Sequence, residues 1–174
     1  MLLRGINIGP RNRIAMPALR EALEAAGFDN VRTYVQSGNV VLSASTKPEQ
    51  TARKVERVIA DRFGLEIPVV VRTKAQLAGV VKKNPLAKVA KEPKRYQVSF
   101  LDAKPKAAAV KKLEAAVAGK EQLVVDGREI YAWHDAGVAR SKLWAALAGK
   151  EIGVTATARN WTTVEALLAL ASEK

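Results

Sequence analysis

The sequence of 174 residues contains no cysteine and one histidine, His134, and aromatic residues make up only 5% of it. Without cysteine the chain has no disulfide, no thiolate metal site and no cysteine nucleophile. A single imidazole is also a poor basis for a metal site, so we expect neither a metal nor another cofactor. No apolar run reaches the ~18 residues of a membrane-spanning helix, and the N-terminus lacks the order of a secretory signal. We therefore expect a cytoplasmic protein without a membrane partner.

Positive charge is what the chain has in excess. Lysine and arginine number 29 against 17 acidic residues, which gives a net charge of +12 and a pI near 10.1. The excess is spread along the chain and does not form a basic tail. Because cationic proteins release counterions when they bind phosphates, nucleic acid is the first partner we expect, ahead of another phosphorylated ligand. The oligomeric state stays open.

The first half of the chain, residues 1–83, has the periodicities of a strand, a helix, two strands, a helix, a strand and a further helix. The two middle strands flank Ser37-Gly38, a hairpin signal. Thr46 with Glu49 and Thr73 with Gln76 have the spacing of a capping box, which predicts helix starts. We expect strands within residues 1–8, 31–36, 39–44 and 67–71, and helices that begin near Pro17, Thr46 and Thr73.

The second half, residues 95–174, repeats this order. Asp126-Gly127 between two apolar runs is a strong hairpin signal. We expect strands at residues 96–101, 123–125, 129–134 and 152–156, and helices at 107–117, 141–148 and 162–171. The predicted fold is α+β, a tandem of two duplicated ferredoxin-like split βαβ halves. The basic linker 84–94 joins them.

Six segments carry a resemblance to a known family. In chain order they are LLRGINIGPRNRIAMPALREALEAAGF, RTYVQSGNVVLSA, IPVVVRT, GREIYAW, ARSKL and TARNWTTVEALL. This succession resembles a bacterial domain-of-unknown-function family, number 1697 in its series. The resemblance implies a compact α/β fold and no assigned activity, and it supplies no catalytic residue. Family members usually begin several residues before LLRGIN, and a glycine is commoner where this chain has Pro10.

A first cluster of polar residues follows from the split βαβ topology, which places the loop at residues 5–16 and the turn at 36–39 on one sheet edge. Guanidinium groups, amides and backbone N–H groups near glycine bind anions. The alternative is that Asn7 and Asn39 satisfy their own turns, with the arginines solvated. The cluster consists of Arg4, Asn7, Arg11, Asn12, Arg13, Gln36, Ser37 and Asn39.

A second cluster lies at the predicted starts of two helices, where basic neighbours favour phosphate binding. Ser141 reads as a helix cap, since adjacent Lys142 does not face it on a helix. Trp161 either stacks on a base or packs into the core. The cluster consists of Arg140, Ser141, Lys142, Arg159, Asn160 and Trp161.

Three functional interpretations stay open. Tyr96, Tyr131 and Trp133 form a base-stacking platform if their sheet face is exposed, and core if helices cover it. An enzyme acting on a phosphorylated small molecule is the alternative to a nucleic-acid binder, and an interaction module with open sheet faces is the third. In the enzyme, Arg11, Arg13, Arg140 and Arg159 would hold the anion. No catalytic residue stands out, and Asp135 is the only acidic sequence neighbour of His134.

Overall fold

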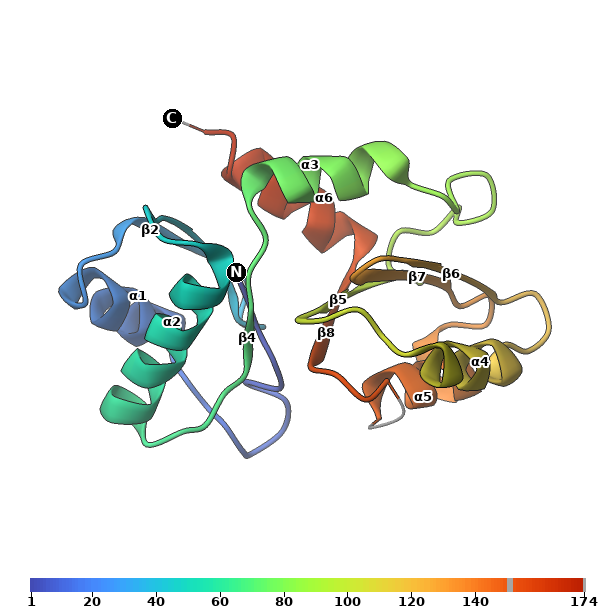
Figure 1. Cartoon of the computed structure of the whole chain (residues 1–174), viewed down its shortest axis with the longest axis horizontal. Coiled ribbons are helices and arrows are strands. Elements are labelled where there is room, and N and C mark those ends of the chain that lie inside the picture. The colour runs from blue at the N-terminus through green and yellow to red at the C-terminus, as the bar shows by residue number, and fades with distance from the viewer. Residues whose placement is uncertain (150–151, 174) are drawn as a thin grey trace. The chain divides into compact units, whose positions relative to one another are not determined.

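The computed structural model describes residues 1–149 and 152–173, with six α-helices and two four-stranded antiparallel sheets in this part of the chain (Figure 1). The chain divides into two compact units. Unit 1 holds Met1–Ala75 and the C-terminal segment from Leu167, and unit 2 holds Gln76–Ala166. Residues 84–94, expected as a linker, lie within unit 2. They form hydrogen-bonded turns around Leu86, which is buried.

Unit 1 has one sheet with the strand order β2-β3-β1-β4. Neighbouring strands are antiparallel, and the short β1 pairs with both β3 and β4. Helix α2 ends at Gly64, whose φ of 66° suits glycine at a helix C-terminus. The elements are β1 (Leu2–Leu3), α1 (Met16–Ala25), β2 (Asp29–Tyr34), β3 (Asn39–Ser43), α2 (Pro48–Phe63) and β4 (Val69–Val70).

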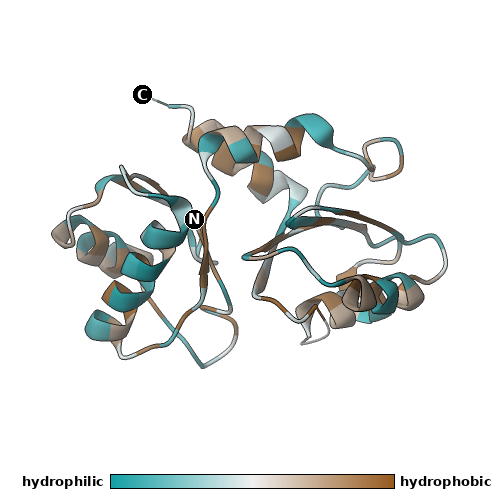
Figure 2. Cartoon of the chain, in the orientation of Figure 1, coloured by the Kyte–Doolittle hydropathy of each residue, from teal (hydrophilic) through white to brown (hydrophobic). Residues whose placement is uncertain are grey.

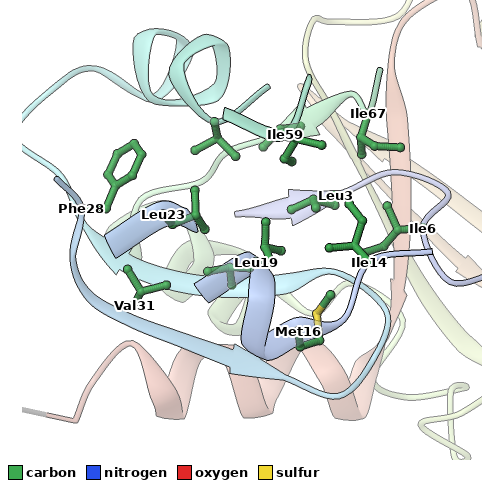
Figure 3. Packing of buried hydrophobic residues seen from close by; sticks show 13 residues of the cluster. Leu3, Ile6, Ile14, Met16, Leu19, Leu23, Phe28, Val31, Ile59 and Ile67 are labelled. Atoms are coloured by element: carbon green, nitrogen blue, oxygen red, sulfur yellow. The ribbon is translucent and has the colours of Figure 1, made fainter. Parts of the chain in front are cut away.

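The core of unit 1 lies between the two helices and one face of this sheet. Leu19 and Leu23 of α1 and Ile59 of α2 are fully buried and point toward Leu3 of β1 (Figure 3). On the other face of the sheet Arg32 forms an ion pair of 2.8 Å with Glu173. The C-terminal segment of the unit therefore contacts this second face through Glu173.

Unit 2 has a second sheet with the strand order β6-β7-β5-β8, the same order of elements as in unit 1. A 3-10 turn at Val138–Arg140 precedes α5. The elements are α3 (Lys74–Lys83, in unit 2 from Gln76), β5 (Tyr96–Leu101), α4 (Ala107–Ala116), β6 (Gln122–Asp126), β7 (Glu129–Trp133), α5 (Lys142–Ala148), β8 (Ala156–Asn160) and α6 (Trp161–Leu170, in unit 2 up to Ala166).

Both faces of the second sheet are buried. Leu101, Ile130 and Leu143 belong to the core cluster under α4 and α5. On the opposite face Tyr96 and Tyr131 are each 1% exposed. Figure 2 shows apolar residues gathered along the strands, in keeping with this burial. The aromatic residues are therefore core, and the alternative of an open stacking platform is wrong.

Several predicted boundaries are shifted in the structure. The last strand was expected at residues 152–156, but β8 spans Ala156–Asn160 and runs directly into α6. Pairing with β5 sets this register, since Ala156 lies opposite Leu101 and Asn160 opposite Gln97. The N-cap of α2 lies one residue later than expected, at Lys47, whose backbone N–H donates to Gln50 Oε1 at 3.4 Å.

Among the described residues, every helix is too short or too polar to span a membrane.

Candidate functional site

The loop after β1, residues 4–14, is held in a compact form by left-handed backbone positions. Gly5, Asn7, Gly9 and Asn12 have φ values of 67°, 55°, 68° and 52°. Glycine and asparagine tolerate this region better than other residues. The N–H of Asn7 donates to the carbonyl of Asn12 at 3.0 Å, which closes the loop on itself. We call residues 4–14 the arginine loop, after Arg4, Arg11 and Arg13.

Asn7 joins the arginine loop to the turn between β2 and β3. Its Nδ2 donates to the carbonyls of Ile14 at 2.9 Å and Gln36 at 2.7 Å, and its Oδ1 accepts from the N–H of Ile14 at 2.9 Å. The predicted proximity of loop and turn is thus confirmed. Both N–H groups of the Asn7 side-chain amide donate to carbonyls of the protein. Asn7 therefore positions the arginine loop beside the turn.

The turn at residues 35–38 is likewise ordered from within. Asn39 is fully buried, and its Nδ2 donates to the carbonyl of Tyr34 at 3.1 Å and to Ser37 Oγ at 2.9 Å. The carbonyl of Gly38 accepts from the N–H of Leu3 at 2.8 Å. Gln36 and Ser37 are exposed, so they face solvent while Asn39 satisfies the turn beneath them.

The guanidinium groups of the arginine loop lack acidic partners. Arg11 and Arg13 are exposed and Arg4 is half-buried. Among the described residues no carboxylate forms an ion pair with these three arginines, whereas Arg20 lies 3.8 Å from Glu24 and Arg32 lies 2.8 Å from Glu173. An unpaired exposed guanidinium can donate two parallel hydrogen bonds to a phosphate. These arginines are therefore the strongest anion-binding groups of the first cluster.

Two exposed apolar residues accompany these arginines, and neither was predicted. Ile8 is 76% exposed in the loop and Val35 is 54% exposed in the turn. Val35 was expected in the strand at residues 31–36, because branched apolar residues favour strands, whereas Ile8 falls within both the expected strand region 1–8 and the expected loop 5–16. The glycines flanking the motif GINIG were the available signal that Ile8 lies in a loop.

The second cluster divides into buried and exposed members. Arg159 is 8% exposed, and its Nη1 donates to Thr157 Oγ1 and to the carbonyl of Ala158, both at 2.7 Å. Burial lowers the pKa of Arg159 to about 10, so it stays protonated at neutral pH. Asn160 Oδ1 accepts from the N–H of Thr163 at 2.9 Å. Arg140 and Lys142 are exposed.

Trp161 packs within unit 2. Its ring is stacked on that of Tyr96, with centroids 4.8 Å apart and planes 12° apart, and it is 6% exposed. The ring centroids of Tyr96 and Tyr131 are 6.5 Å apart. Burial raises the pKa of Tyr96 to about 12, so its hydroxyl stays neutral. The aromatic group is a packed cluster, which leaves Arg140 and Lys142 as the accessible cations of the second set.

His134 has a carboxylate partner that the sequence did not reveal. Glu121, and not Asp135, is its acidic neighbour: His134 Nδ1 lies 3.3 Å from Glu121 Oε1 and 2.9 Å from Ser141 Oγ. A hydrolytic triad needs the serine and the carboxylate on opposite ring nitrogens. Here both meet Nδ1. Ser141 Oγ also accepts the N–H of Trp144 at 2.9 Å, which confirms the predicted cap of α5.

The buried His134 predicts a dependence of stability on pH. Burial lowers its pKa below the ordinary value of 6.5, against an opposing effect of Glu121. As pH falls below about 6.5, His134 becomes protonated in the unfolded chain but stays neutral in the folded chain. The contribution of neutral His134 to the free energy of unfolding is therefore lost as pH falls through the folded pKa. Urea unfolding between about pH 7.5 and pH 5 should show this loss. His134→Gln should flatten the profile; an unchanged profile in that variant would contradict the assignment.

No metal centre is evident in residues 1–149 and 152–173, where no three His, Asp or Glu side chains lie close enough to hold an ion. What the described residues do offer is a set of exposed cations on ordered loops. The chemistry of such a set is the binding of anions by charge-assisted hydrogen bonds.

Comparisons with known proteins agree with the resemblance and the fold. The sequence model of a family described as "Protein of unknown function (DUF1697)" matches residues 1–131, a segment that contains the arginine loop. The fold is similar to that of the conserved bacterial protein SP0830 from Streptococcus pneumoniae, with a TM-score of 0.76 and 19% identity over 98% of this chain and 96% of that chain. No curated protein matches.

Proposed function

Because the chain belongs to DUF1697, a family of proteins of unknown function, we propose a role from its own surface: it binds a phosphate-rich ligand, nucleic acid first, through the arginine loop. The observation that carries this proposal is the exposure of Arg11 and Arg13 on an ordered loop without a carboxylate partner among the described residues. The net charge of +12 adds long-range attraction for a polyanion.

The backbone of the arginine loop strengthens the proposal. The left-handed positions at Gly5, Asn7 and Gly9 fold the loop back on itself, and the N–H of Asn7 closes it by donating to the carbonyl of Asn12 at 3.0 Å. The bond from Asn7 to Gln36 fixes the loop before any ligand arrives. A preorganised cation surface loses less conformational entropy on binding than flexible side-chain arms do.

A polymer suits this surface better than a small phosphorylated substrate. Small-ligand sites are concave and enclose most of the ligand, whereas Arg11 and Arg13 are exposed to solvent. Exposed arginines contact successive phosphates of a chain that runs across them. The Ser141–His134–Glu121 arrangement gives the alternative of a hydrolytic enzyme no support, since both partners meet the same nitrogen.

We also infer that each unit is a ferredoxin-like split βαβ and that the chain arose by duplication. The equivalent strand orders β2-β3-β1-β4 and β6-β7-β5-β8 support this inference. Ferredoxin-like RNA-binding modules stack bases on aromatic residues of the open sheet face. Here Tyr96 and Tyr131 are buried, so the proposed contact moves from the sheet face to the loops.

The double variant Arg11→Gln/Arg13→Gln should weaken nucleic-acid binding and its dependence on salt. Each lost phosphate contact lowers the slope of log K against log salt, and two contacts to a single strand lower it by about 1.4. Fluorescence anisotropy with labelled DNA and RNA oligonucleotides, at low and raised salt, measures both quantities. We expect tight binding by the wild type at low salt and a clearly reduced slope in the variant.

Arg53→Gln/Arg57→Gln is the matched control. These two arginines are exposed on α2 and their replacement removes the same net charge from outside the loop. We expect this control to keep the wild-type slope to within experimental error. An equal loss in both variants would assign the binding to net charge and reject the arginine loop, and no binding at low salt would reject the function.

A further inference from the structure

We propose that the surface formed by the arginine loop and the turn at residues 35–38 selects single-stranded over double-stranded nucleic acid. This inference rests on the proposed function and names the form of its ligand. Its basis is that Ile8 and Val35, the exposed large apolar residues of the described chain, both belong to these two segments.

Ile8 and Val35 are brought to one surface by the hydrogen bond of 2.7 Å between Asn7 Nδ2 and the carbonyl of Gln36. Each apolar residue is the sequence neighbour of one partner in that bond. Arg11 and Arg13 lie in the same loop as Ile8. The surface therefore combines apolar side chains with guanidinium groups that lack carboxylate partners among the described residues.

Val35 is held in a conformation that its side chain disfavours. Its φ is 50°, in the left-handed region where a β-branched residue is an outlier. Asparagine or glycine would relieve the backbone there. Backbone outliers of this kind cluster at sites where a ligand is bound.

Charge complementarity and the apolar pair together favour a single strand. A duplex presents phosphates but hides its base faces within the stack, whereas a single strand offers both phosphates and unstacked bases. Guanidinium planes also stack on bases, so Arg11 and Arg13 can serve either group. Ile8 and Val35 supply apolar contacts that unstacked bases can use, and a stacked duplex exposes less apolar surface to them.

The test is anisotropy titration with a labelled DNA strand, an RNA strand of the same sequence and the duplex, at matched salt. We expect the wild type to bind the strands at least about tenfold more tightly than the duplex, the equivalent of one base contact. Ile8→Ser should weaken strand binding about five- to tenfold while its duplex affinity changes less than about twofold. Ile8→Val, which keeps a branched apolar side chain, should retain most of the affinity.

Val35→Asn separates the strain from the contact. We expect this variant to melt a few degrees higher, because the left-handed strain is relieved, yet to bind the strands about fivefold more weakly. Equal binding of strand and duplex, or unchanged strand affinity in both Ile8→Ser and Val35→Asn, would overturn the inference while salt-dependent binding upheld the proposed function. If the protein binds none of the three probes, both the inference and the proposed function are overturned. Tighter binding to anionic vesicles than to the strands would assign the surface to a membrane and reject it for nucleic acid.

Discussion

Trp161→Ala should lower the free energy of unfolding by about 3–5 kcal/mol, the usual cost of removing a large aromatic ring from a core. Trp161 is 6% exposed and its ring is stacked on Tyr96 at 4.8 Å, so its removal leaves a cavity and strips one face of Tyr96. Urea unfolding followed by circular dichroism measures the change. Trp161→Phe, which keeps an aromatic ring over Tyr96, should lose much less.

The same variant decides between the two interpretations of Trp161 in the sequence. If Trp161 is a core residue, the folded Trp161→Ala protein, assayed at low temperature, should bind oligonucleotides as the wild type does. A base-stacking residue would lose about 1–3 kcal/mol of binding energy instead. A small change in stability together with weakened binding would therefore contradict the packing seen here.

Gly38→Ala should destabilise unit 1 by about 2–5 kcal/mol. Gly38 has a φ of 74°, which costs an L side chain about 1–2 kcal/mol. An added Cβ would also lie 2.7 Å from Leu3 Cβ and 2.9 Å from the Ile6 side chain. Leu3 and Ile6 belong to the buried core and have little room to move, so overpacking adds a further about 1–3 kcal/mol.

Gly9→Ala is the matched control for this prediction. Gly9 has nearly the same φ, 68°, but a Cβ there meets nothing within 4 Å. Only the conformational cost of about 1–2 kcal/mol applies to it. Urea unfolding of both variants measures the difference; equal losses would contradict the close approach of the turn to β1.

The periodicity of the sequence predicted the order of elements well, because a buried face leaves a pattern. Strand β5 at Tyr96–Leu101 and the cap at Ser141 match their predicted positions. The periodicity did not predict the bounds of β8, because pairing with β5 alone decides its register. Strand β8 carries Arg159 and Asn160, which no strand propensity favours, and its register comes from β5.

The candidate site was predictable in its location but only partly in its residues. Topology placed the arginine loop beside the turn, and the bond from Asn7 to Gln36 realises that placement. The sequence could not tell that the Asn7 amide is used internally, or that Val35 leaves the strand for a left-handed turn. Side-chain engagement and local strain depend on tertiary contacts, which composition and spacing do not encode.

If nucleic acid contacts the arginine loop and the adjoining turn, an NMR titration will locate the contact residue by residue. Backbone amide shifts of the full chain would be followed as an unlabelled DNA strand is added at low salt. We expect the largest shifts at residues 4–14 and 35–38, and we expect the Arg11→Gln/Arg13→Gln variant to lose them. Shifts concentrated on α2 or around Arg140 and Lys142, with residues 4–14 unchanged, would contradict it.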